Sequence, residues 1–97
     1  MPIVMCLLVR GLALSMSKEI MVELSAIDRY IIDKVKELRT AKGYSQEHLS
    51  GLIGKAEGYI GNVESPKRGK HYNTKILNEL AKALECSPKE FWPEKPL

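Results

Sequence analysis

The side chains best able to do chemistry in this chain are basic, and they gather in one window. Between residues 55 and 75, five lysine and arginine residues stand against two glutamates, and this local excess equals the formal net charge of +3 of the whole chain. The five are Lys55, Lys67, Arg68, Lys70 and Lys75. Such a concentration is typical of a surface that faces a polyanion. Charge alone leaves a solvated, lysine-rich loop as the alternative.

The sequence indicates neither a metal site nor a catalytic set. The two histidines, His48 and His71, are far apart, and neither Cys6 nor Cys86 has another cysteine nearby. This spacing favours neither zinc binding nor a disulfide framework, and it suits a reducing cytoplasm. No serine, cysteine or carboxylate has a base at a defensible spacing. We therefore expect a protein that is not an enzyme and has no metal, cofactor or small-molecule ligand.

The N-terminal stretch is apolar but short. Residues 3–14, IVMCLLVRGLAL, form a run of twelve that contains Arg10, whereas a membrane-spanning helix needs about twenty apolar residues. We therefore expect no membrane span. A signal peptide, an arm that packs on the domain or on a partner, and a later start at Met16 or Met21 all stay open. The expected organisation is an arm or extension over residues 1–24 and one domain over residues 25–97.

From Ser25 onward the spacing of apolar residues is helical. Ser25 and Asp28 resemble a capping box that opens a first helix, which Gly43 closes. Ser45 is a good N-cap for a second helix, which ends at Gly54. A third helix is expected over residues 56–64.

Two further helical segments are expected after a polar loop. A fourth helix begins near Asn73 or Thr74, and its apolar stripe runs to Leu84. A last turn opens with Ser87 as N-cap, has Pro88 at N1, and ends at Pro93. Its Phe91 and Trp92 are expected to close the core. The sequence thus predicts an all-α domain of five short helices.

This order of segments carries a resemblance. SQEHLSGLIG and KAEGYIGNVES, followed by a basic loop and ILNELAKALECSPKEFW, resemble the phage repressor and Cro type of helix-turn-helix, the XRE family, over residues 28–93. Gln46 opens the second helix of the motif, Leu49 and Gly54 match its leucine and its turn glycine, and Glu64 matches the end of its third helix. The resemblance implies that the third helix docks in the major groove while the second lies on the DNA backbone.

The resemblance also implies which residues touch DNA. The base-reading positions are Glu57, Gly58, Gly61 and Asn62. Asn62 can pair with adenine and Glu57 can accept from a cytosine amino group, whereas the two glycines offer only backbone and close approach. The DNA-backbone positions are Gln46, Tyr59, Lys67, Arg68, Lys70, His71 and Asn73, and Tyr72 could add a hydrogen bond. Solvated or packed side chains are the alternative for each.

Arg39 and Glu64 occupy positions that form a structural ion pair in relatives of this family, so the resemblance implies the same pair here. The sequence departs from the family pattern at two positions of the turn, where Lys55 replaces an apolar residue and Ala56 replaces a Ser or Thr cap. Loss of such a cap costs about 1 kcal/mol.

Taken together, these features favour a transcription regulator that binds double-stranded DNA as a homodimer, with its dimer surface at the C-terminal turn or the N-terminal arm. The alternative is a helix-turn-helix module that binds a protein, antitoxin-like or polymerase-binding, which the glycines at the reading positions favour.

Overall fold

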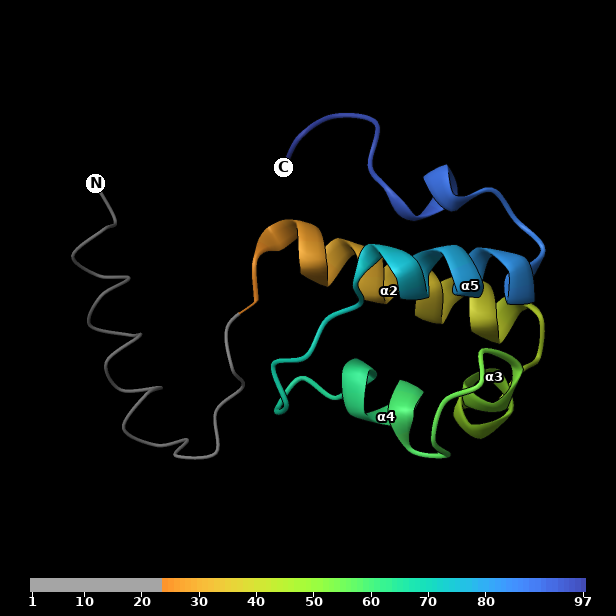
Figure 1. Cartoon of the computed structure of the whole chain (residues 1–97). Coiled ribbons are helices and arrows are strands. Elements are labelled where there is room, and N and C mark those ends of the chain that lie inside the picture. Colours follow the sequence, from red (N-terminus) through yellow and green to blue (C-terminus); the bar gives the residue numbers. More distant parts are fainter. Residues whose placement is uncertain (1–23) are drawn as a thin grey trace, which may run out of the picture.

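The computed structural model describes residues 24–97 and shows an all-helical fold, with no strand in that range (Figure 1). The helices are α2 (Ala26–Ala41), α3 (Gln46–Leu52), α4 (Tyr59–Glu64), α5 (Thr74–Leu84) and the 3-10 helix η1 (Pro88–Phe91). The predicted all-α class is confirmed. Four of the five predicted segments are α-helices, and the last, expected as a turn from Ser87, is a 3-10 helix. The arm predicted over residues 1–24 lies outside the described residues, except for Leu24.

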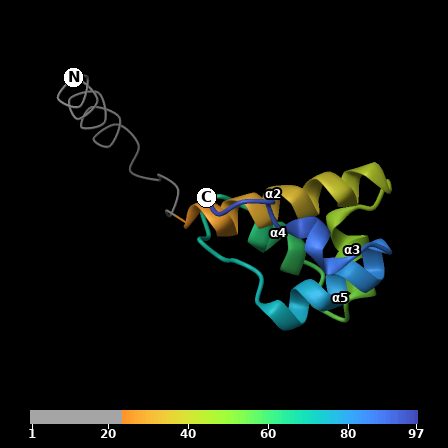
Figure 2. The same cartoon turned by 90° about the horizontal axis from the view of Figure 1, so that it is seen from above.

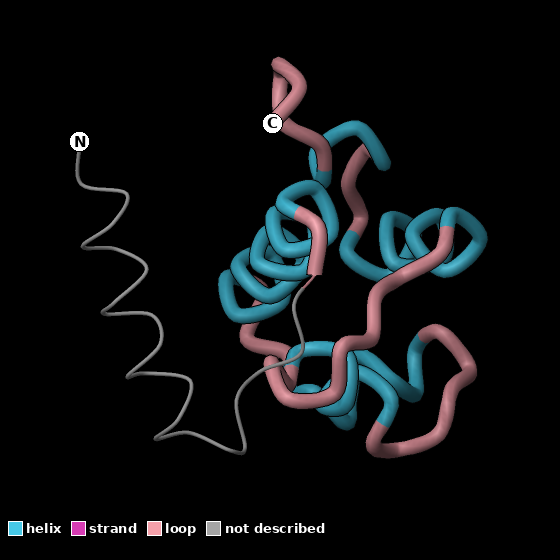
Figure 3. Tube along the Cα trace, turned by 90° about the vertical axis from the view of Figure 1, so that its left-hand side faces the viewer, coloured by secondary structure: helices cyan, strands magenta, loops and turns pink. Residues whose placement is uncertain are grey.

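The helices are arranged around the pair α2 and α5. Figure 1 shows α3 and α4 on one side of this pair and η1 on the other. Seen from above, α3 lies at the C-terminal end of α2 (Figure 2). In a view roughly along α2, the two sides are again separated by α2 and α5 (Figure 3). The α3–turn–α4 unit and η1 therefore occupy opposite sides of the molecule.

Local capping sets the helix boundaries. The Ser25 hydroxyl accepts the Asp28 N–H at 3.1 Å and donates to the Asp28 carboxylate at 2.9 Å, so the predicted capping box opens α2. Gly43, with φ of +76°, follows the end of that helix. The Ser45 hydroxyl accepts the His48 N–H at 2.9 Å and starts α3. These boundaries are confirmed because each depends on residues only a few positions apart.

The start of the third helix was predicted three residues too early. α4 begins at Tyr59, and residues 57 and 58 form a turn before it. Ala56 has no side-chain acceptor, and Gly58, the observed N-cap, makes no side-chain cap hydrogen bond. Because Glu57 and Gly58 precede the first helical turn, they lie in the connection and not on the helix.

The core lies where all helices meet. Val35, Leu49, Ile60, Leu80 and Phe91 have no exposed side-chain surface. Trp92, which was expected to close the core together with Phe91, is 46 % exposed, so that expectation was wrong. η1 ends at Phe91 and Trp92 has extended backbone angles, so neighbouring side chains diverge and only one of them enters the core.

The ends of α2 and α5 are joined at the surface. Glu85 caps α5 in the left-handed region, with φ of 57° and ψ of 48°. The Lys42 ammonium, just after α2, donates to the Glu85 carboxylate at 2.6 Å. This contact raises the pKa of Lys42 and lowers the pKa of Glu85. Both groups are solvated, so the pair contributes little to stability.

Candidate nucleic-acid interface

α3 and α4 are connected by a turn that needs glycine. Gly54 has φ of +72°, a conformation that side chains other than glycine rarely adopt. The Gly54 N–H donates to Gly51 O at 3.0 Å, and the Lys55 N–H donates to Ser50 O at 2.9 Å. This turn gives the two short helices the arrangement of a helix-turn-helix.

Ser50 ties the two helices together from inside the core. Its hydroxyl is fully buried, donates to Gln46 O at 2.9 Å and accepts the Ile60 N–H at 3.0 Å. Because α4 has no side-chain cap of its own, Ser50 supplies the acceptor that its first turn lacks. The sequence alone did not indicate this role of Ser50. The available signal was its position next to Leu49 on a buried face.

Arg39 and Glu64 form a bidentate ion pair between α2 and the end of α4. Arg39 Nε lies 3.0 Å from Glu64 Oε2, and Arg39 Nη2 lies 3.0 Å from Glu64 Oε1. The two side chains are 9 % and 3 % exposed. Arg39 Nη1 also donates to Tyr44 O at 2.8 Å. The Glu64 charge is therefore compensated within the domain and adds no net repulsion toward an anion.

Gln46 joins this pair from the start of α3. Its Nε2 donates to Glu64 Oε1 at 2.8 Å. The side chain crosses α4 beside Gly61, where an added Cβ would lie 3.0 Å from Gln46 Oε1. Gln46 is thus fixed between the N-terminus of one helix and the C-terminus of the next.

The four predicted base-reading positions lie together at the start of α4 and in the turn before it. Glu57, Gly58 and Asn62 are exposed, and Gly61 is half-buried. A Cβ at Gly58 would lie 3.9 Å from Asn62 Nδ2. Of these four positions only Glu57 and Asn62 carry side chains, so hydrogen bonds from them to bases would depend on these two.

Two tyrosines border this surface in different ways. Tyr59 is half-buried, with the Lys55 ammonium 5.5 Å from its ring centroid, and burial raises the pKa of its hydroxyl. The Tyr72 ring lies 6.3 Å from the Tyr59 ring and is 5 % exposed. Tyr72 is a core residue, so the expectation that it adds a surface hydrogen bond was wrong. Its buried hydroxyl has no hydrogen-bond partner within residues 24–97.

The basic loop after α4 is exposed. Lys67, Arg68, Lys70 and His71 all have solvent-accessible side chains, and none forms an ion pair with another described residue. Asn73 ends the loop, and its Oδ1 accepts the Ile76 N–H at 2.8 Å as the N-cap of α5. Asn73 therefore has a structural role and can offer only its Nδ2 to another molecule.

Residues 24–97 lack the features of a metal site or of a membrane span. Among residues 24–97 no three His, Cys, Asp or Glu side chains are grouped closely enough to hold a metal ion. Within the same part of the chain, each helix is too short or too polar to cross a membrane.

The fold and the α3–turn–α4 geometry define a helix-turn-helix protein, and solved structures identify its family. The restriction-modification controller protein C.AhdI from Aeromonas hydrophila is similar with a TM-score of 0.58 and 36% identity, over 65% of this chain and 92% of that chain. Given this identity and coverage, the chain belongs to the Cro/C1-type, or XRE, helix-turn-helix family.

A second solved structure shares the fold. It is the hypothetical transcription factor NHTF from Neisseria, with a TM-score of 0.61 and 23% identity over 76% of this chain and 86% of that chain. No family model and no curated protein matches the sequence. Neither similar structure is described as an enzyme.

Proposed function

We propose that this protein is a transcription regulator that binds double-stranded DNA by docking α4 in the major groove. The observation that carries the proposal is the position of the basic loop directly after α4, beside a Glu64 whose charge Arg39 already compensates. A major groove about 12 Å wide admits one helix. One of the two similar structures is a controller protein and the other a hypothetical transcription factor, which supports a regulatory role.

The DNA backbone is contacted from both sides of α4. On one side Gln46, at the N-terminus of α3, donates to a phosphate. On the other side the loop residues donate to the opposite phosphates. The expected loop contacts are Lys67, Arg68, Lys70 and His71, with Tyr59 and the Asn73 Nδ2 at the edges. These charge-based contacts supply most of the affinity.

Base reading rests on few side chains. Asn62 pairs with adenine, and Glu57 accepts from a cytosine amino group. Gly58 and Gly61 allow the backbone to approach the groove closely. With two reading side chains per domain, we expect modest discrimination between sequences, with DNA shape contributing the remainder.

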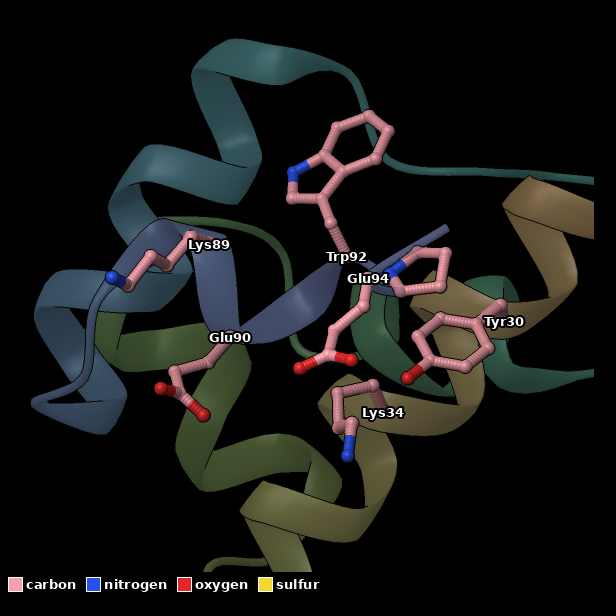
Figure 4. A pocket seen from close by; sticks show the side chains of 7 residues that line it. Tyr30, Lys34, Lys89, Glu90, Trp92 and Glu94 are labelled. Carbon is pink, nitrogen blue, oxygen red and sulfur yellow. The ribbon is translucent and has the colours of Figure 1, made fainter. Parts of the chain in front are cut away.

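Paired half-sites would multiply this modest affinity, so we propose a homodimer that spans about one helical turn of DNA. A hollow near the C-terminus offers a surface for this association, and its volume is about 500 Å³. Its lining combines Trp92 and Tyr30 with two lysines and two glutamates, and Figure 4 shows these side chains gathered between α2 and the segment after η1. This hollow lies on the η1 side, away from α4, so association there leaves the α3–turn–α4 unit accessible.

A second function, binding of a partner protein through the same surface, is favoured by Gly58 and Gly61. They leave a smooth patch with few hydrogen-bonding side chains, which suits contact with another protein more than reading of bases. The basic loop favours DNA, since an uncompensated row of cations has a natural partner in phosphate.

Electrophoretic mobility shifts with random duplex DNA at two salt concentrations separate the two functions. We expect binding that weakens with salt, and Lys67→Ala and Arg68→Ala should each lower the slope of log affinity against log salt by about one. Lys95→Ala is the matched control, because Lys95 is exposed in the tail beyond η1. Absence of binding to random duplex and to fragments selected from genomic DNA, even at low salt, would overturn the proposal and favour the protein-binding alternative.

A further inference from the structure

Gly61 stands in α4 where the backbone does not require glycine. It is the third residue of a six-residue helix, and its φ is not positive, unlike that of Gly43 or Gly54. Glycine is a poor helix former compared with alanine. Its presence at this position therefore has to be explained by what surrounds it.

Apart from its chain neighbours and the backbone of its own helix, Gly61 has one side chain beside it. A Cβ at this position would meet Gln46 Oε1 at 3.0 Å and Gln46 Cδ at 3.6 Å, and no third such atom within 4 Å. At Gly51, on α3, a Cβ would meet nothing within 4 Å, and at Gly58 it would touch only Asn62 at 3.9 Å. Gly61 is thus the position at which an added methyl group would press on the Gln46 amide and force it to shift by a few tenths of an ångström.

The Gln46 amide has a defined place because Glu64 holds it. Nε2 donates to Glu64 Oε1 at 2.8 Å, and Glu64 is itself fixed by two hydrogen bonds from Arg39. A carboxamide has two N–H donors, so one remains for another acceptor. The Oε1 atom lies against the bare Cα of Gly61.

We propose that Gly61 is a positioning residue: its missing side chain lets the Gln46 carboxamide lie across α4, where Glu64 orients its remaining N–H toward a DNA phosphate. This inference rests on the proposed function, because it takes the α3–turn–α4 surface to be the DNA-facing one. α3 thereby supplies a polar group at a point on α4 where α4 has no side chain of its own. Gly61 acts through Gln46 and reads no base itself.

The proposal predicts that Gly61→Ala lowers affinity much more than stability. The methyl group improves the helix propensity of α4, and this gain offsets the weakened Gln46 hydrogen bond to Glu64, so the urea midpoint should change little. Duplex affinity should fall roughly tenfold, the size of one hydrogen bond to a charged group. A residue with only a structural role would not lower affinity while leaving stability intact. The matched control is Gly51→Ala, which should keep full affinity.

A double-mutant cycle with Gln46→Ala shows whether Gly61 acts through Gln46. Gln46→Ala alone should weaken binding by a similar factor, and adding Gly61→Ala to it should have no further effect. In the absence of DNA, Gly61→Ala should shift the side-chain amide resonances of Gln46 in the NMR spectrum of the whole protein. The proposal would be overturned if Gly61→Ala lowered duplex affinity equally with and without Gln46→Ala, or if it left affinity unchanged. Gln46 amide resonances that do not move in Gly61→Ala would overturn it as well.

The cycle also distinguishes failure of this inference from failure of the proposed function. If Lys67→Ala and Arg68→Ala weaken duplex binding while Gln46→Ala does not, the role of Gly61 is disproved and DNA binding stands. If the unmodified protein binds no duplex, both proposals fail together.

Discussion

Ser50 and Ile60 join the two helices of the motif through one buried hydrogen bond. The Ser50 hydroxyl, fully inaccessible to solvent, accepts the Ile60 N–H at 3.0 Å, and it also donates to Gln46 O within its own helix. A serine on one helix thereby caps the first turn of the next. Because this bond spans the turn, it fixes the angle between α3 and α4 as well as satisfying a backbone donor.

Ser50→Ala should therefore destabilise the domain. The Ile60 N–H would remain buried without an acceptor, which costs about 1–3 kcal/mol. Urea denaturation followed by circular dichroism measures the loss. Gly51→Ala is the control, because Gly51 is exposed and follows Ser50 in the same helix. It should raise the free energy of unfolding by about 0.5–1 kcal/mol. An unchanged urea midpoint in Ser50→Ala would show that the cap is dispensable.

Arg39→Met should be more damaging than Ser50→Ala. It leaves Glu64, whose side chain is 3 % exposed, as a buried carboxylate whose remaining side-chain hydrogen bond within residues 24–97 comes from Gln46. Removing one partner of such a pair costs about 3–5 kcal/mol, whereas replacing both partners by apolar residues is often nearly neutral. The double variant Arg39→Met/Glu64→Leu should thus recover most of the lost free energy of unfolding. A single-variant loss below about 1 kcal/mol would instead match a solvent-exposed pair.

Tyr72→Phe should stabilise the protein at neutral pH. The Tyr72 hydroxyl is buried and has no partner among the described residues, and removing such a group recovers about 1 kcal/mol of desolvation cost. Urea midpoints of the two proteins give the difference. A loss of stability in Tyr72→Phe would indicate that the hydroxyl is hydrogen-bonded, for example to a buried water.

Stability should fall in alkaline solution because of the same residue. Burial, reinforced by the charge of Glu64, raises the pKa of Tyr72 above the ordinary value of 10.0. Above pH 10 the folded protein keeps the Tyr72 proton that the unfolded chain releases. The free energy of unfolding therefore has its full value below pH 10 and falls as pH rises further. The expected slope is about 1.4 kcal/mol per pH unit.

Urea denaturation from about pH 8 to about pH 11 measures this slope. Tyr72→Phe should lack it, whereas Tyr59→Phe should keep it, because Tyr59 is only half-buried. If the free energy of unfolding fell with pH equally in Tyr72→Phe and in the unmodified protein, the slope would not come from Tyr72.

The features that could be predicted from the sequence are those determined by neighbouring residues. Ser25, Ser45 and Asn73 each cap the helix that directly follows them, and Gly54 makes its turn without help from elsewhere in the chain. Apolar spacing likewise predicted the stripe of the fourth helix, whose last residue, Leu84, is buried in the core. The family resemblance added the pairing of Arg39 with Glu64, which no local pattern contains.

The features that were missed depend on contacts between distant residues. α4 starts late because Ala56 cannot cap it, and its acceptor comes from Ser50 on another helix. Tyr72 follows a basic run, which suggests a surface position, yet it packs beside Tyr59 in the folded protein. Trp92 was placed in the core by its hydrophobicity, although the extended backbone after η1 turns it away from the core that Phe91 enters.

The exposure of Trp92 has an optical consequence. It is the only tryptophan in the chain, and it directly follows η1, which lies on the side of α2 and α5 opposite α4 (Figure 1). Its indole emission therefore samples the polarity of that one side. Association that covers the C-terminal turn should shift the emission to shorter wavelength, and contact confined to α4 should leave it unchanged. The protein thus contains its own spectroscopic label for telling self-association from binding at the helix-turn-helix.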